Sequence, residues 1–324
     1  MSLQKPIRLR KTAPLRNLVR ETRLSVDDII RPIFVTHFNK QLEIETMPGQ
    51  FYFPLNEVEK TIDASMKLGI NGVLLFGIPE IRDDLGTDTI NENGIIQQAV
   101  RKIKQSFPEL IIITDVCFCQ YTTHGHCGIL NKFGNIDRKC SLKQLQVQAL
   151  SHVDAGADFL APSCMIDGMV KYIRKALNES EYEDRGILSY AIKYASSFYG
   201  PFRDAVDSSP KQGTRRSYQM DPGNIREALK EAQMDIDEGA DIIMVKPALP
   251  YLDVIKEVKK QVSSPVAAYQ VSGEYAMIKA VSQKNWMDEN ESMMESLLGI
   301  KRSGADIIIT YFADNAARII NSQS

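Results

Sequence analysis

The sequence predicts an α/β protein, a (β/α)8 TIM barrel with an extended N-terminal arm. Eight short runs are near-continuous in Ile, Leu and Val rather than alternating, as is typical of parallel strands that are covered on both faces. Helical segments lie between most of these runs, which indicates βαβ units with right-handed crossovers. Eight is also the number of strands that closes a TIM barrel. The runs are residues 29–35, 72–78, 110–116, 159–163, 187–192, 242–246, 266–271 and 307–312.

The expected helices have recognisable end signals. The motif Ser141-x-x-Gln144 predicts a capping box at the start of one helix, and Asp221-Pro222 predicts the N-cap and first residue of another. Glycine supplies the left-handed conformation that stops a helix. We expect helices over residues 57–68, 142–155, 225–238 and 293–303, each followed by a glycine, at Gly69, Gly156, Gly239 and Gly304.

We expect one catalytic domain over residues 29–324, preceded by an arm over residues 1–28, because no shift in composition marks a second domain. An open doubly wound sheet is the alternative architecture. A dinucleotide-binding version of that sheet needs a glycine-rich turn after the first strand. The chain has Thr36-His37-Phe38 there, which does not support a dinucleotide site.

The charge balance and hydropathy exclude several classes of partner. Lys and Arg number 39 against 41 Asp and Glu, for a formal net charge of −2, whereas nucleic-acid binding needs a net basic face. No apolar run approaches the ~18 residues that span a bilayer, and no secretory signal is recognisable. We therefore expect a cytoplasmic protein with reduced cysteines. The basic N-terminal segment is expected to be a surface arm, with an organelle transit peptide as the alternative.

Polar side chains follow six of the eight predicted strands. In a TIM barrel the carboxyl ends of the strands meet at one face, where the active site lies. One or two polar groups there would carry little information, but six strands that direct them to one face predict a site. The side chains are Asp115, Ser163, Lys193, Lys246, Ser272 and Tyr311.

Three cysteines follow the third strand. Cys117, Cys119 and Cys127 lie on one strand-to-loop segment. Three thiolates suit zinc and leave its fourth position open for water or substrate. His124 and His126 lie between them and could ligate or orient the metal. Three buried thiols without metal are the alternative, and we expect structural roles for Cys140 and Cys164.

Two lysines end neighbouring strands. Lys246 lies in an apolar strand, where lysine is rare unless it is paired or used, and Lys193 ends the preceding strand in the same way. Burial and a neighbouring cation lower an amine's pKa, and a neutral amine can form a Schiff base with a carbonyl substrate. A salt-bridged or snorkelling lysine is the alternative at either position.

The segment 199–218 is predicted to be a long loop that closes over the site. Long loops in a compact domain are usually lids or disordered segments. It carries Arg203, Lys211, Arg215 and Arg216, and arginine suits the bidentate clamping of a carboxylate. A solvated charged loop is the alternative.

Taken together, these residues resemble the porphobilinogen synthase (5-aminolevulinate dehydratase) family, zinc-dependent branch. The resemblance runs along nearly the whole chain. Its motifs are Asp115-Val-Cys-Phe-Cys119, His124-Gly-His-Cys-Gly128, Lys193-Tyr-Ala-Ser-Ser-Phe-Tyr-Gly-Pro-Phe-Arg-Asp204, Tyr218-Gln-Met-Asp-Pro222, Met244-Val-Lys-Pro247 and Tyr269-Gln-Val-Ser-Gly-Glu-Tyr275.

The resemblance implies a lyase of tetrapyrrole (haem) biosynthesis, which condenses two 5-aminolevulinate molecules to porphobilinogen with loss of two waters. It implies a Schiff base on Lys246 with the propionate-side substrate and on Lys193 with the acetate-side substrate. Asp115 and Ser163 would assist proton transfer. The remaining substrate-binding residues would be Ser272 and Tyr311 for one carboxylate, Arg203, Arg215 and Gln219 for the other, and Tyr199, Phe202 and Tyr269 around them.

The resemblance also implies metals and an assembly. Catalytic zinc would be bound by Cys117, Cys119 and Cys127, and Glu231 matches a position that anchors an allosteric magnesium in many bacterial relatives. Relatives are homo-octamers in which the N-terminal arm embraces a neighbouring barrel.

The chain departs from the family pattern in two places. Cys164 and Met169 replace an Asp and an Arg in the segment Ser163-Cys-Met-Ile-Asp-Gly-Met169, and Gln120 replaces a common Glu. Losing both members of a charged pair strands no charge. We therefore expect changes in subunit contacts, allosteric control and the support of the metal, but not in the chemistry.

Two other functions compete with this reading. A Schiff-base class I aldolase on the same barrel would use one lysine and a phosphate site after the last strands. The chain has no glycine-rich cradle there, and the cysteines would be superfluous. A non-catalytic zinc-binding or redox-sensing protein would keep its function when Lys193 and Lys246 are replaced by alanine.

Overall fold

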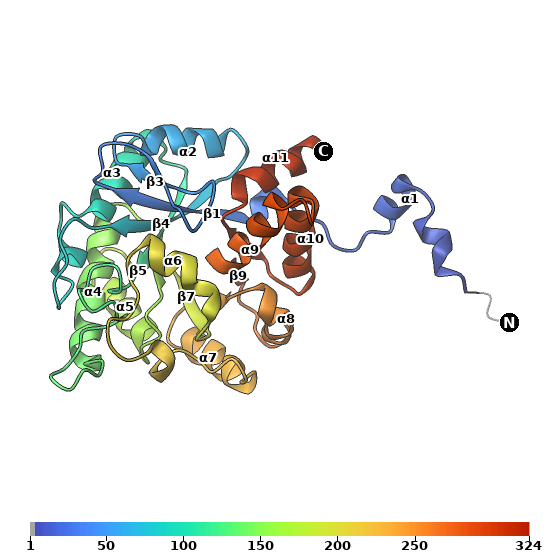
Figure 1. Ribbon diagram of the computed structural model, residues 1–324. Coiled ribbons are helices and arrows are strands. Elements are labelled where there is room, and N and C mark those ends of the chain that lie inside the picture. The colour runs from blue at the N-terminus through green and yellow to red at the C-terminus, as the bar shows by residue number, and fades with distance from the viewer. Residues whose placement is uncertain (1–3, 324) are drawn as a thin grey trace.

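In the computed structural model, which describes residues 4–323, eight parallel strands form a closed barrel (Figure 1). Each strand pairs with the next along the chain, and the last pairs with the first to close the barrel. The strands are β1 (Ile29–Thr36), β4 (Gly72–Ile78), β5 (Ile111–Val116), β6 (Phe159–Pro162), β7 (Gly186–Lys193), β8 (Ile242–Lys246), β9 (Val266–Gln270) and β10 (Ile307–Thr310).

Helices cover the outside of the barrel and bury the outer faces of its strands (Figure 1). The predicted barrel is therefore confirmed, and so are all eight predicted strands, within two residues at their ends. The helices around it are α2 (Val58–Met66), α3 (Ile95–Ser106), α4 (Arg138–Asp154), α5 (Met169–Asn178), α6 (Gly200–Ala205), α7 (Arg226–Asp237), α8 (Leu252–Gln261), α9 (Ser272–Gln283), α10 (Glu289–Arg302) and α11 (Ala313–Gln323).

Two additional short strands were not predicted. β2 (Leu42–Glu43) and β3 (Phe51–Pro54) form an antiparallel pair, and β3 extends the barrel sheet by pairing in parallel with β1. Two strands of this length contain too few residues for a periodic pattern, which explains why the sequence did not indicate them.

Both predicted N-cap motifs were wrong, although the predicted glycine stops are confirmed and α7 begins within one residue of the expected Ile225. α4 begins before Ser141, because the Asp137 side chain caps it by accepting from the Cys140 N–H, and Ser141 Oγ instead accepts from the Ile129 N–H at 2.9 Å. Asp221 caps only a turn, accepting from the Gly223 N–H at 2.8 Å, and α7 begins later. The four helix-stopping glycines have positive φ: Gly69 (87°), Gly156 (112°), Gly239 (104°) and Gly304 (115°).

The segment before β1 stands away from the barrel for most of its length (Figure 1). Its helix α1 (Ala13–Leu18) buries no residue, and Ile7 and Leu18 are exposed. The end of the segment differs, because Val26 is buried in the main core and Asp28 pairs with Lys301 at 2.7 Å. Leu24 and residues 26–28 thus pack on the barrel, while most of residues 4–23 offer apolar and basic side chains to solvent.

An irregularity in β7 sets the direction of two interior side chains. Ser189 pairs with Ile243 and Ile192 with Val245, so three steps along β7 match two steps along β8. Such a bulge adds one residue and turns the following side chains to the other face. Tyr190 and Lys193 are three residues apart and would face opposite ways in a regular strand. In the structure the Lys193 ammonium lies 5.5 Å from the centroid of the Tyr190 ring.

Candidate active site

The two lysines stand side by side inside the barrel. Lys193 and Lys246 are register partners at the ends of β7 and β8, and each is only 6% exposed. Lys193 Nζ donates to the carbonyl oxygen of Ser163 at 2.5 Å. Both amines line one small cavity of about 20 Å³. That cavity is lined by Phe76, Asp115, Cys119, Ser163, Lys193, Tyr199, Phe202, Arg215 and Lys246.

Four aromatic rings surround the Lys246 ammonium. Its nitrogen lies 4.2 Å from the ring centroid of Tyr269, 4.8 Å from Tyr190, 5.4 Å from Phe202 and 5.5 Å from Tyr199. The Tyr199 hydroxyl also donates to the Lys246 carbonyl oxygen at 3.1 Å. The predicted residues Tyr199, Phe202 and Tyr269 therefore form the wall around this amine. Tyr190 belongs to the same wall and was missed, because the bulge in β7 has no signal in the sequence.

Burial makes Lys246 a reactive amine. Burial, followed by the charge of Lys193, lowers the pKa of Lys246 to about 7, and the opposite charge of Asp115 only partly offsets this. Burial likewise raises the pKa of Asp115 to about 6, against Lys193 and a hydrogen bond from Ser163. Near neutral pH the site thus holds an amine and a carboxyl group that can both exchange protons. The alternative of a salt-bridged or snorkelling lysine is not supported for Lys246, which is buried and has no ion pair of 4 Å or less with a described residue.

We expect the nucleophilicity of Lys246 to increase with pH up to neutrality. Only the neutral amine reacts, so with a pKa of about 7 roughly a tenth of the lysine is reactive at pH 6 and about nine tenths at pH 8. Acetylation of Lys246 by a limiting amount of acetic anhydride, measured by peptide mass spectrometry, should rise about tenfold per unit below pH 7 and level off above it. A rate that keeps rising tenfold per unit to pH 10 would contradict the lowered pKa.

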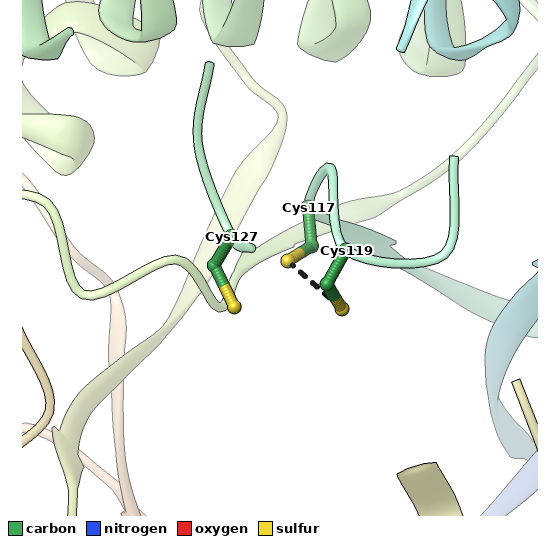
Figure 2. A group of neighbouring side chains, drawn as sticks. All are labelled: Cys117, Cys119 and Cys127. Atoms are coloured by element: carbon green, nitrogen blue, oxygen red, sulfur yellow. Dashed lines mark hydrogen bonds between the residues drawn. The ribbon is translucent and has the colours of Figure 1, made fainter. Parts of the chain in front are cut away.

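The three cysteines form one buried thiol cluster. The Sγ atoms of Cys117, Cys119 and Cys127 lie within 4.8 Å of one another (Figure 2). Cys117 Sγ donates to Cys119 Sγ at 3.6 Å. Hydrogen bonds from the thiols of Cys117 and Cys119 hold the pKa of Cys127 well below its usual range, so the cluster favours a thiolate. Three buried sulfur ligands, of which Cys119 also lines the cavity of the two lysines, fit a zinc ion with one open position.

The neighbouring histidines are engaged elsewhere. His126 Nδ1 lies 3.1 Å from the Tyr218 hydroxyl, and its Nε2 lies 2.8 Å from the Gln212 carbonyl oxygen. His124 Nδ1 accepts from the His126 N–H at 3.0 Å, and its Nε2 lies 3.3 Å from the Asp84 carbonyl oxygen. Both rings therefore orient the loop around the cysteines and do not join the cluster.

The remaining cysteines differ from each other. Cys140 is exposed, whereas Cys164 is buried and its thiol interacts with that of Cys117. The unusual Gln120 lies beside the same cluster, where its Oε1 accepts from Cys119 Sγ at 3.9 Å. Two of the family departures thus lie beside the predicted metal site, which the sequence indicated for Gln120 but not for Cys164.

Unpaired donors gather where one substrate carboxylate is predicted to bind. Arg203 Nε, Arg215 Nε and both polar atoms of the Gln219 side chain are buried and have no hydrogen-bond partner among residues 4–323. Arg215 is held in place by donating to the carbonyl oxygens of Gly125, at 2.8 Å, and Ser208. Buried polar groups are normally satisfied, so the N–H donors of Arg203, Arg215 and Gln219 fit an anionic ligand, whereas Gln219 Oε1 would need a donor.

The other residues that are predicted to bind a substrate carboxylate pack against the aromatic side chains around Lys246. Ser272 Oγ accepts from the Phe202 N–H at 2.9 Å, and the Tyr269 hydroxyl donates to that of Tyr311 at 3.0 Å. Phe202 and Tyr269 both face Lys246. Ser272 and Tyr311 contact these two residues and therefore lie behind them, farther from the amine. Their binding of a carboxylate remains a prediction.

The predicted loop over the site is partly helical, which corrects its description as a loop throughout. Residues Gly200–Ala205 form α6, and Pro201 lies in its first turn. The Tyr52 hydroxyl donates to the Ala205 carbonyl oxygen at 2.6 Å, and Arg82 pairs with Asp207 at 2.6 Å. The segment therefore packs down onto the barrel mouth, and it places Phe202 against Lys246 and Arg203 over the ring of Tyr199.

Glu231 does not line the cavity of the two lysines. It lines a separate cavity of about 930 Å³ together with Asp167, Glu227, Asp235 and Glu238. Burial and the charge of Asp167 raise the pKa of Glu231. These carboxylates and the replaced residue Met169 line the cavity expected to hold magnesium, but within residues 4–323 only the three cysteines lie close enough together to form a group of metal ligands.

Reactive side chains that converge at the carboxyl ends of eight parallel strands are characteristic of TIM-barrel enzymes, and this chain has both the fold and such a site. Its sequence narrows the class further: the family model of delta-aminolevulinic acid dehydratase matches residues 3–319. The chain belongs to that family.

Similar proteins cover almost the whole chain. The delta-aminolevulinic acid dehydratase of Halalkalibacterium halodurans is 50% identical over 317 residues, which are 98% of this chain and 96% of the relative. That of Archaeoglobus fulgidus is 51% identical over 311 residues, 96% of each. A crystal structure of the Toxoplasma gondii ME49 enzyme in complex with its reaction product porphobilinogen matches with a TM-score of 0.97 and 38% identity, over 100% of this chain and 93% of that one.

The structure holds no candidate for a membrane-crossing helix: within residues 4–323, no helix combines the length and the apolar character that such a span needs.

Proposed function

We propose that this chain is a porphobilinogen synthase, which condenses two molecules of 5-aminolevulinate to porphobilinogen with loss of two waters, in tetrapyrrole biosynthesis. The observation that carries the proposal is the pair of buried lysines that share one cavity, in a chain similar over its whole length to an enzyme solved with porphobilinogen. A class I aldolase would use one lysine, so the second amine and the thiol cluster would have no role in its reaction.

The lysine side chains would activate the two substrate ketones. The neutral amine of Lys246 adds to the ketone carbon of one substrate, and the resulting carbinolamine loses water to give a Schiff base. Lys193 would do the same with the second substrate, so that two waters are lost in total. A C–C bond between the two substrates and a C–N bond from the amino group of one substrate to the Schiff-base carbon of the other would then form, while the two carbon–lysine bonds break and both lysines leave as free amines. Lys246 takes the propionate-side molecule and Lys193 the acetate-side molecule.

Asp115 and Ser163 would handle the protons of these steps. A carboxyl group with a pKa of about 6 can both accept and donate a proton near neutral pH. The Ser163 carbonyl oxygen already accepts from Lys193, and its hydroxyl bonds to Asp115, so one residue links the amine to the acid. Loss of the carbinolamine oxygen as water needs such a proton donor.

The substrate carboxylates would be bound at two separate places. The unpaired donors of Arg203, Arg215 and Gln219 would bind the carboxylate of the acetate-side molecule. Ser272 and Tyr311 would bind that of the propionate-side molecule. Two separate clamps would hold two identical substrates in different orientations, which an asymmetric condensation requires.

Metals would complete the site. Cys117, Cys119 and Cys127 would hold zinc, which when bound acts as a Lewis acid toward a substrate oxygen. The acidic cavity around Glu231 would hold an allosteric magnesium ion outside the site. We propose a cytoplasmic location, where free thiols are maintained.

The product assay tests the proposal directly. The purified chain is incubated with 5-aminolevulinate alone, and porphobilinogen is measured with time. Formation of porphobilinogen supports the proposed reaction. If no porphobilinogen forms while the chain cleaves an aldol substrate, the aldolase alternative is correct instead.

The arm is proposed to join subunits into a homo-octamer. Deletion of residues 1–25 should reduce the size of the assembly, because the segment leaves Ile7, Leu9 and Leu18 exposed for a neighbour. The cut spares residues 26–28, which pack on the chain's own barrel. Light scattering coupled to size exclusion measures the mass, and a mass per assembly reduced only by the deleted residues would contradict the arm's role.

A further inference from the structure

One aromatic ring lies against both reactive amines. The centroid of the Tyr190 ring is 4.8 Å from Lys246 Nζ and 5.5 Å from Lys193 Nζ. The bulge in β7 makes this possible, because it turns Lys193 to the same interior face as Tyr190. Tyr190 is fully buried, so no solvent separates its ring from the two nitrogens.

The other rings around Lys246 do not share this position. Tyr269, Phe202 and Tyr199 lie within cation–π range of Lys246. Within residues 4–323, Lys193 has only the Tyr190 ring at such a distance. Tyr190 is therefore the ring that the two amines have in common.

The ring, rather than the hydroxyl, is the part of Tyr190 that contacts the amines. Its hydroxyl is buried without a hydrogen-bond partner among the described residues. An aromatic face attracts a cation, and the attraction is stronger where both groups are desolvated. When either lysine forms a protonated Schiff base, the positive charge resides on the same nitrogen, above the same ring.

We propose that Tyr190 is a positioning residue for both lysines, whose ring orients the two amines and stabilises the positive charge of the Schiff base formed at each. This inference rests on the proposed function, since it assumes that both lysines react. It assigns one side chain to two covalent steps, whereas Tyr269 would serve only the step at Lys246.

The test compares trapped adducts on the two lysines. Wild type, Tyr190→Leu, Tyr190→Phe and Tyr269→Leu are incubated with 5-aminolevulinate, reduced with borohydride and mapped by peptide mass spectrometry. Tyr190→Leu should lower the adduct at both lysines and reduce kcat about tenfold, with KM changed less than about threefold because the carboxylate clamps remain. Tyr190→Phe should restore both adducts, and Tyr269→Leu should lower mainly the adduct at Lys246.

A matched control separates this role from general packing. Tyr194 is also fully buried on the segment after β7, but it stacks on Tyr251 at 4.0 Å and donates to the Asn224 carbonyl oxygen at 2.8 Å, away from the amines. Tyr194→Leu should destabilise the fold as much as Tyr190→Leu does, without changing the ratio of trapped adduct to folded protein. If Tyr190→Leu does not fold, pentafluorophenylalanine at position 190 keeps the shape of phenylalanine and reverses the charge of the ring face.

The outcomes distinguish the two proposals. Wild type that forms no adduct on either lysine would contradict the proposed function, and with it this role. Wild type that forms both adducts, with Tyr190→Leu or the pentafluoro variant equal to Tyr190→Phe, would contradict the role of Tyr190 alone. Loss of the adduct at only one lysine would show that the ring is not shared.

Discussion

Replacement of Lys246 with methionine is expected to abolish turnover and to leave the barrel folded. Methionine fills a similar volume inside the aromatic wall but has no amine to form a Schiff base. The rate should fall by at least about a thousandfold, because covalent catalysis is lost together with the residue. Initial rates of porphobilinogen formation measure the effect, and circular dichroism and thermal melting measure the fold.

The fold should tolerate this change well. Burial already lowers the pKa of Lys246 to about 7, which means that the folded state disfavours the charged amine. An apolar side chain at the same place removes that cost. Lys284→Met is the control, because Lys284 lies over the exposed Trp286 at 5.3 Å, far from the site in the fold. Substantial activity in Lys246→Met would exclude the covalent role.

Replacement of Cys119 with alanine should remove zinc and activity together. Cys119 belongs to the thiol cluster and also lines the cavity of the two lysines, so it links the metal to the substrates. Loss of an indirect metal partner commonly costs about 10–100-fold in metal affinity or activity, and loss of a ligand should cost more. Metal content by mass spectrometry and turnover are measured on the same sample.

Cys140→Ala is the matched control for this prediction. Cys140 is exposed and lies outside the cluster, so its variant should retain zinc and activity. Zinc that stays stoichiometric in Cys119→Ala would contradict the proposed ligand set. Activity that survives removal of all metal from the wild type would leave the cysteines with a structural role.

Much of the fold could be predicted because the burial of a strand determines which residue types it contains. Each barrel strand is covered on both faces, so its residues are apolar in succession, and the helix-stopping glycines are needed for their positive φ. Helix starts were harder, because any Ser or Asp can cap. Ser141 lies inside α4 and serves the Ile129 N–H instead.

The site was predictable to the extent that its chemistry depends on residue type. A lysine in an apolar strand and three cysteines close together in the sequence are both unusual patterns, and each indicates functional residues. The aromatic wall was only partly predictable, because the place of Tyr190 depends on a bulge in β7 that no residue pattern signals. The contact of Cys164 with Cys117 likewise joins the ends of two strands that are distant in sequence.

The two-lysine site is tested most directly by mapping the substrate on the protein. The wild-type chain is mixed with a small excess of 5-aminolevulinate, reduced at once with borohydride and digested, and the modified peptides are identified. We expect adducts on both Lys193 and Lys246, and single chains that carry both adducts. An adduct that is confined to one lysine under every condition, with porphobilinogen still formed, would contradict this expectation.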